Sequence, residues 1–144
     1  MKDHPQEIQS SVFIPMLYLK NLSDAIEFYK KAFGATERWR IDHKGNIHVA
    51  EMTIPPAIFR MHEEVSRDQQ LSPLTLKGTS IVIGLLVNNP DELAARAIAA
   101  GAIELSPMQD YEYGYRQGTI RDPFGHHWCI EKLDDLKKVP VITG

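Results

Sequence analysis

The chain has little of several features that mark large classes of protein. Its 144 residues include one cysteine, Cys129, so no disulfide can form within the chain and a disulfide scaffold is excluded. Its 16 basic and 19 acidic residues give a net charge of −3, which leaves no basic field for nucleic acid or anionic lipid. The longest apolar run, residues 81–87, is far too short to span a bilayer. We therefore expect a cytoplasmic protein with no nucleic-acid or membrane partner.

Neither glycine nor proline is enriched, and no segment has a biased composition. The chain contains nine residues of each type, with 43% hydrophobic and 24% charged residues, which is typical of a folded globular protein. Its length suits one domain, or two halves that share a core.

The sequence does contain an internal repeat. Residues 19–37 match residues 86–104 without a gap, and seven of the nineteen positions are identical. The identical pairs are Leu19/Leu86, Asn21/Asn88, Asp24/Asp91, Ala32/Ala99, Gly34/Gly101, Ala35/Ala102 and Glu37/Glu104. Asparagine and aspartate favour helix starts, and glycine favours the position just past a helix end. The repeat therefore predicts equivalent amphipathic helices at residues 21–34 and 89–101.

An apolar strand precedes each predicted helix, and three extended segments follow it. The expected strands are residues 12–19, 36–41, 47–54 and 57–62, then 80–87, 104–105, 119–121 and 126–132, with a loop at 108–117. The sequence thus predicts an α+β fold of tandem βαβββ modules that form a curved mixed sheet with the helices outside. The expected boundaries are a tail (1–10), a first module (11–62), a linker (63–78), a second module (79–132) and a C-terminal tail (133–144).

Three segments resemble a known superfamily: the helix ends FYKKAFGA and AAGA, and the turn RDPFGHHW. With the duplicated βαβββ pattern, the chain resembles the vicinal oxygen chelate superfamily of glyoxalases, bleomycin-resistance proteins and extradiol dioxygenases. SPLTLKGTS, YEYGYRQGTIRDPFGHHW and the proline of IPMLYL resemble its phosphonate-operon-like branch, also labelled demethylubiquinone-methyltransferase-like. The resemblance covers residues 11–133 and implies the fold, but this fold supports many reactions.

In metal-dependent members of that superfamily, the first and last strands of the two modules supply four metal ligands. The equivalent positions here are Ile14 or Pro15, Arg60, Val82 or Ile83, and Cys129. A divalent ion needs three or four nitrogen, oxygen or sulfur donors. We therefore expect no metal and no other cofactor there. A different metal site, from His48, His62 and either Glu131 or Cys129, is an alternative.

Alternation along the last strand of each module assigns side chains to two faces of the sheet. One face carries the apolar residues Phe59, Met61, Trp128 and Ile130. The other carries Arg60, His62, Cys129 and Glu131, and the resemblance implies that this face lines a ligand cavity. Such residues offer a cation for an anionic ligand, a base and a thiol. The alternative is an Arg60–Glu131 ion pair beside an inert cysteine.

Four further residues complete the predicted ligand site. His48, on the alternation face of Ala50 and Met52, would add an imidazole, and Trp39 an aromatic surface. In the expected loop at residues 108–117, Tyr113 and Arg116 would form part of a lid, with Arg116 gripping a carboxylate or phosphonate. Structural roles are the alternatives: a solvated histidine, a core tryptophan, and tyrosines that pack on their own domain or on a partner subunit.

These residues favour a small-molecule-binding protein of the bleomycin-resistance type that takes an anionic or aromatic ligand without metal. We expect a homodimer, because a partner subunit would cover exposed sheet edges. An enzyme of the same superfamily is the alternative: a lyase, isomerase or dioxygenase with an altered metal site or an acid–base set. A pure assembly module is a third hypothesis, which polar residues inside a cavity would disfavour.

Overall fold

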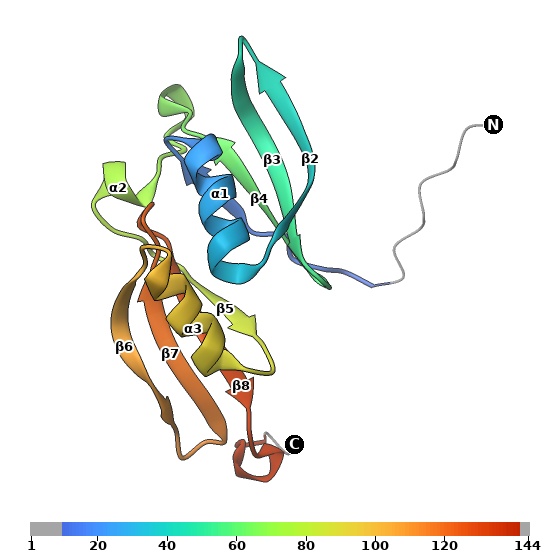
Figure 1. The fold of residues 1–144 in the computed structure, drawn as a ribbon, viewed down its shortest axis with the longest axis vertical. Helices are drawn as coiled ribbons and strands as arrows, with labels where there is room; N and C mark the ends of the chain where they lie inside the picture. Colours follow the sequence, from blue (N-terminus) through green and yellow to red (C-terminus); the bar gives the residue numbers. More distant parts are fainter. Residues whose placement is uncertain (1–9, 142–144) are drawn as a thin grey trace, which may run out of the picture.

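The computed structural model describes residues 10–141, and its two halves share one architecture (Figure 1). The elements are β1 (Met16–Leu19), α1 (Leu22–Phe33), β2 (Thr36–His43), β3 (Asn46–Ile54), β4 (Ala57–Glu63), α2 (Pro73–Leu76), β5 (Val82–Leu86), α3 (Pro90–Ala99), β6 (Ile103–Asp110), β7 (Tyr115–Arg121) and β8 (His127–Leu133). Most of the predicted N-terminal tail, residues 1–9, and the last three residues, 142–144, lie outside the described part. The α+β class and both βαβββ modules are confirmed.

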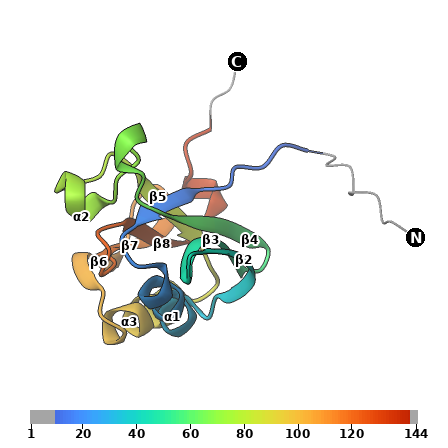
Figure 2. The ribbon, with the colours of Figure 1, turned by 90° about the horizontal axis from the view of Figure 1, so that it is seen from above.

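Each module contains one mixed four-stranded sheet. The strand orders are β1-β4-β3-β2 and β5-β8-β7-β6. β1 runs parallel to β4 and β5 parallel to β8, whereas the other neighbours are antiparallel. The helices α1 and α3 lie side by side on the same side of the two sheets (Figure 2). We call the opposite face of each sheet its open face. Between residues 10 and 141 no helix is long and apolar enough to cross a membrane.

Both long helices start on an asparagine. The Asn21 side chain accepts a hydrogen bond from the N–H of Asp24 at 3.1 Å, and Gly34 ends α1 in the left-handed region with φ +65°. α3 is capped by Asn89, one position later than the repeat alignment with Asn21 implies. The difference arises because Pro90, which lacks an N–H, occupies the first helical position and places the cap immediately before it.

The predicted loop at residues 108–117 is wrong. β6 continues to Asp110, and β7 begins at Tyr115, so the segment is mostly a hairpin. β6 is an edge strand that contains Pro107, and its pairing with β7 is irregular. An edge strand tolerates proline because its outward side needs no N–H donor. The segment was predicted to be a loop because polar residues surround this proline in the sequence.

The linker between the modules is held in place at two points. Glu64 accepts hydrogen bonds from the N–H and hydroxyl of Ser72, at 2.8 and 2.6 Å, and from the hydroxyl of Thr75. These bonds, the Ser72 hydroxyl foremost, lower the pKa of Glu64. At the other end, a β-carbon added to Gly125 would lie 2.8 Å from the β-carbon of Pro73. The short helix α2 is thus packed tightly on the β7–β8 turn.

One hydrophobic core spans both modules. The rings of Tyr29 and Phe33 in α1 lie 5.7 and 4.9 Å from the ring of Trp128 in β8. A second connection joins the helices, because the Arg96 side chain of α3 donates to the Lys31 carbonyl near the end of α1 at 2.5 Å. Neither module therefore completes its core alone.

A buried carboxylate, Asp122, lies at this junction and is 3% exposed. It accepts hydrogen bonds from the Tyr29 hydroxyl at 2.6 Å and the Trp128 indole N–H at 2.9 Å. The backbone N–H groups of Phe124 and His126 donate to its other oxygen at 2.9 and 3.0 Å. Burial, together with the Asp122 charge, raises the pKa of Tyr29 well above its usual value. The phenol therefore stays protonated and donates to Asp122.

We expect Asp122→Ala to lower the free energy of unfolding by about 3 kcal/mol, because it leaves the buried Tyr29 hydroxyl and Trp128 N–H without an acceptor. Urea denaturation measures this loss. Asp68→Ala, on an exposed 3₁₀ turn, is the control and should cost less than about 0.5 kcal/mol. Similar small losses in both variants would contradict a structural role for Asp122.

Candidate functional site

The open face of the first sheet carries a row of polar and aromatic side chains. Alternation in β4 is as predicted: Phe59 is buried against Tyr29 of α1, whereas Arg60 is partly exposed on the opposite face. The strand register then brings Glu51 of β3 opposite Arg60, and Trp39 of β2 opposite Glu51. Trp39, Glu51 and Arg60 therefore lie side by side across three strands.

Glu51 is the centre of this row, although it is only 4% exposed. Its two carboxylate oxygens bind two arginines, the Nε of Arg60 at 2.9 Å and a terminal nitrogen of Arg38 at 3.1 Å. A buried carboxylate needs such partners, because desolvating an unpaired charge is costly. Two guanidinium groups on one carboxylate leave one net positive charge at the surface. The sequence analysis missed both Glu51 and Arg38.

Trp39 supports the Arg60 side chain. The guanidinium carbon of Arg60 lies 5.7 Å from the centre of the Trp39 ring, which is within cation–π distance. Trp39 is 38% exposed, so it is a surface residue and its predicted alternative role in the core is wrong. Because Glu51 holds only the Nε of Arg60, the two terminal nitrogens of that guanidinium form no hydrogen bond within residues 10–141.

His48 has a partner that the sequence analysis did not find. Its Nδ1 lies 2.7 Å from a carboxylate oxygen of Glu63, and because a carboxylate can only accept, Nδ1 is the donor of this bond. His48 is the extra residue of a bulge between Val49 and Ile47 in β3. It is therefore partly exposed, unlike Ala50 and Met52, the residues predicted to share its face, which are fully buried.

His62 lies next to His48, with 4.5 Å between the ring centres. Its Nδ1 lies 2.7 Å from the backbone carbonyl of Glu63, so this nitrogen is also the donor. The ring of Tyr18 from β1 lies 5.3 Å from the His62 ring. The end of the first sheet thus holds two imidazoles whose orientation is fixed by Glu63.

The second sheet carries a separate group on its open face. The Gln117 side-chain amide donates to Glu131 at 2.6 Å, and the Tyr113 hydroxyl donates to the amide oxygen of Gln117. Glu131 also lies against Gly84, where a β-carbon would approach its carboxylate to 3.0 Å. The predicted alternative of an Arg60–Glu131 ion pair is wrong, because Glu51 binds Arg60 and Gln117 binds Glu131.

Cys129 is partly exposed beside this group. Burial is the main cause that raises the pKa of its thiol, and the charge of Glu131 raises it further, against a hydrogen bond with Thr119 that lowers it. A raised pKa keeps the sulfur protonated, and the thiol is a poor nucleophile and metal ligand compared with the thiolate.

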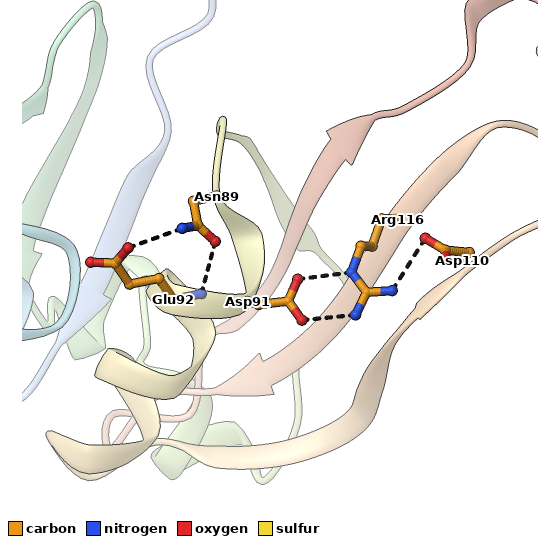
Figure 3. A network of polar contacts seen from close by, with 5 residues as sticks. All are labelled: Asn89, Asp91, Glu92, Asp110 and Arg116. Carbon is orange, nitrogen blue, oxygen red and sulfur yellow. Dashed lines mark hydrogen bonds and ion pairs between the residues drawn. The ribbon is translucent and has the colours of Figure 1, made fainter.

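Arg116 lies on the other side of the second sheet, next to α3 (Figure 3). Two of its nitrogens donate to the two oxygens of Asp91 at 2.8 Å each, and a third donates to Asp110 at 3.2 Å. Hydrogen bonding to Asp91 raises the pKa of Arg116 and lowers that of Asp91. The guanidinium joins the start of α3 to the β6–β7 hairpin, and the structure does not bring it together with the other predicted site residues.

The predicted site residues therefore form two groups. The first sheet holds Trp39, His48, Arg60 and His62, and the second sheet holds Tyr113, Cys129 and Glu131. Within residues 10–141 no hydrogen bond or ion pair connects the two groups.

The donor set does not fit the superfamily's metal. Arg60 and Cys129 are the only side chains with a nitrogen or sulfur atom at the four equivalent positions, and Arg60 is a cation that is bound to Glu51. The described part of the chain contains no group of three or more histidine, cysteine or acidic residues able to hold a metal ion. The alternative set of His48, His62 and Glu131 or Cys129 is divided between two sheets.

The chain matches the Glyoxalase/Bleomycin resistance protein/Dioxygenase superfamily over residues 12–130. It belongs to this superfamily. An uncharacterized protein of Mycobacterium tuberculosis H37Rv is 33% identical over 120 residues, which cover 81% of this chain and 71% of that protein.

Solved structures of other proteins share the fold. TioX from Micromonospora sp. ML1 has a TM-score of 0.67 at 23% identity, covering 93% of this chain and 100% of that chain. A gene product of Arabidopsis thaliana has a TM-score of 0.67 at 26% identity, covering 87% and 99%. The resemblance to the superfamily, identified from the repeat and the turn motifs, is thus confirmed.

The raised pKa of Cys129 predicts slow alkylation. At pH 8 iodoacetamide should react more slowly with Cys129 than with glutathione, because less of the sulfur is thiolate. Glu131→Gln removes a negative charge that raises the pKa and should therefore speed the reaction. Glu112→Gln, in the β6–β7 turn, is the control. Mass spectrometry follows the single cysteine directly, and a wild-type rate at or above that of glutathione would contradict the prediction.

Proposed function

We propose that this protein binds a small anionic aromatic molecule on the open face of the first sheet, without a metal ion. The observation that carries the proposal is the arrangement of Arg60, which Glu51 holds by one nitrogen at 2.9 Å and which lies over Trp39. Its two remaining nitrogens can grip a carboxylate or phosphonate bidentately. The exposed Trp39 ring supplies a surface on which an aromatic group can stack.

Electrostatics supports an anion as the ligand. Arg38 and Arg60 share the single charge of Glu51, so the row as a whole is cationic although the chain is acidic. The buried Glu51 fixes the Arg60 guanidinium before a ligand arrives, which lowers the entropy cost of binding. We propose further that the chain belongs to the phosphonate-operon-like branch, whose motifs its sequence resembles.

We assign the second group of residues to a cleft that forms when two copies of the chain associate as a dimer. Apolar side chains are exposed around the open faces and along the segment that precedes β1, and they include Phe13 (101% exposed), Ile41 (53%), Val82 (53%) and Leu86 (63%). A partner subunit that covers them would remove apolar surface from water and shield sheet edges. Tyr113, Cys129 and Glu131 would then line a cleft closed by that partner.

An acid–base enzyme is the second candidate function, and the His48–Glu63 contact favours it. A carboxylate that orients an imidazole and leaves its Nε2 free is a common general-base arrangement. His48 and His62 would then act on the ligand held by Arg60. Phenylpyruvate, an anionic aromatic ketone, tests this: catalysed exchange of its CH₂ protons in D₂O, lost in His48→Gln, would make the enzyme the better account, and exchange at the uncatalysed rate would contradict it.

Benzoate should quench the fluorescence of Trp39 saturably. Arg60→Gln should weaken this binding by about tenfold or more, because a charge-assisted pair is lost. Arg67→Gln removes an exposed arginine elsewhere in the chain and should leave the affinity unchanged. Equal affinities of the wild type and Arg60→Gln, or no quenching at all, would refute the proposed site.

Light scattering at micromolar concentration should give a particle of twice 16.3 kDa, the mass of one chain. Leu86→Glu, which places a charge on the exposed open face of β5, should shift the particle toward the monomer. A wild-type particle of 16.3 kDa would contradict the dimer.

A further inference from the structure

A second cationic site lies away from Arg60, in a cleft between α2 and the β7–β8 turn. The cleft has a volume of about 290 Å³, and Lys77, Arg121 and His127 line it together with apolar and glycine residues. No aspartate or glutamate is among its lining residues. The sequence analysis assigned no role to Lys77 or Arg121.

The fold brings these three side chains together from two places. Arg121 and His127 are cross-strand partners on either side of the β7–β8 turn, so they share the open face at its end. Lys77 caps the C-terminal end of α2 with φ +60°, and its N–H is bonded to the Pro73 carbonyl. A left-handed lysine is uncommon. The tight contact of α2 with Gly125 keeps Lys77 next to the strand ends.

The charges in this cleft are uncompensated. Within residues 10–141 the side chains of Lys77, Arg121 and His127 form no ion pair and no hydrogen bond, whereas Arg40, Arg60, Arg96 and Arg116 each have an acceptor. The neighbouring carboxylate of Asp122 points into the core, where Tyr29 and Trp128 bind it. Two permanent cations and an imidazole thus converge on one small cavity.

We propose that this cleft binds a phosphate group, either free phosphate or the end of a small phosphomonoester. The guanidinium of Arg121 matches two phosphate oxygens, and the Lys77 ammonium supplies a point charge to a third. His127 adds a ring N–H donor. The side chains of Pro73 and Leu74 form an apolar wall of the cleft, which would contact the organic part of a phosphomonoester.

Isothermal titration calorimetry of the full chain with inorganic phosphate and with phenyl phosphate, at constant ionic strength set with NaCl, tests the proposal. Both probes should bind saturably to the wild type. Arg121→Gln and Lys77→Gln should each weaken binding by about tenfold or more. Arg67→Gln is the matched control, because it removes an exposed arginine of the linker and should leave the affinity unchanged. Heat denaturation of each variant verifies that it is folded.

Absence of saturable binding to the wild type, or unchanged affinity in Arg121→Gln and Lys77→Gln, would overturn the proposal. Tighter binding of phenyl phosphate, lost in Leu74→Ala, identifies a phosphomonoester site, and equal affinities identify a free-phosphate site. Arg60→Gln should retain phosphate binding, and Arg121→Gln should retain benzoate binding. The experiments can therefore refute the phosphate cleft and the first-sheet ligand site independently of each other.

NMR provides a second measurement on the unmodified protein. Saturating phosphate should shift the imidazole resonances of His127 and leave those of His48 and His62 unchanged. Shifts at His48 and His62 with none at His127 would place the anion on the first sheet and refute a site in this cleft.

Discussion

The hydrogen bond from Tyr29 to Asp122 connects the two modules, and the position of both open faces depends on this connection. Tyr29 belongs to α1 of the first module, whereas Asp122 and Trp128 frame the β7–β8 turn of the second. Separating Asp122 from its four donors is costly, because each donor would lose its hydrogen-bond partner. Asp122 therefore holds α1 against the second module, next to α3, and leaves the opposite faces of both sheets available for ligand or partner.

The open face of the first sheet also depends on a buried carboxylate, but the partners of this carboxylate are charged and reach the surface. All the hydrogen-bond donors to Asp122 are neutral groups inside the core, so its charge is not presented at the surface. Glu51 is equally buried, but it is paired with Arg38 and Arg60, whose side chains reach the surface. One buried negative charge thus organises two exposed positive charges. This arrangement gives an acidic protein a local cationic surface, and it orients Arg60 over the Trp39 ring.

Local patterns in the sequence predicted what depends on local geometry. The repeat located both helices, and period-two alternation placed Arg60 and Glu131 on the correct faces, because both signals repeat along a single element. The partners of these residues depend on strand register, which no local pattern specifies, so the Glu51–Arg60 pair and the His48–Glu63 pair were missed. Arg116 was misplaced because its strand was read as a loop, to which alternation does not apply. Pro107 in an edge strand produced that error.

The most direct test of a ligand site on the first sheet uses the two tryptophans as reporters. Trp39 lies exposed under Arg60, whereas the Trp128 indole N–H is bonded to Asp122 in the core. The measurement is a two-dimensional ¹H–¹⁵N NMR titration of the labelled protein with benzoate. Binding at Arg60 predicts a saturable shift of the Trp39 indole resonance with the Trp128 resonance unchanged. A Trp39 resonance that does not move, while amides of β7 and β8 do, would contradict the account.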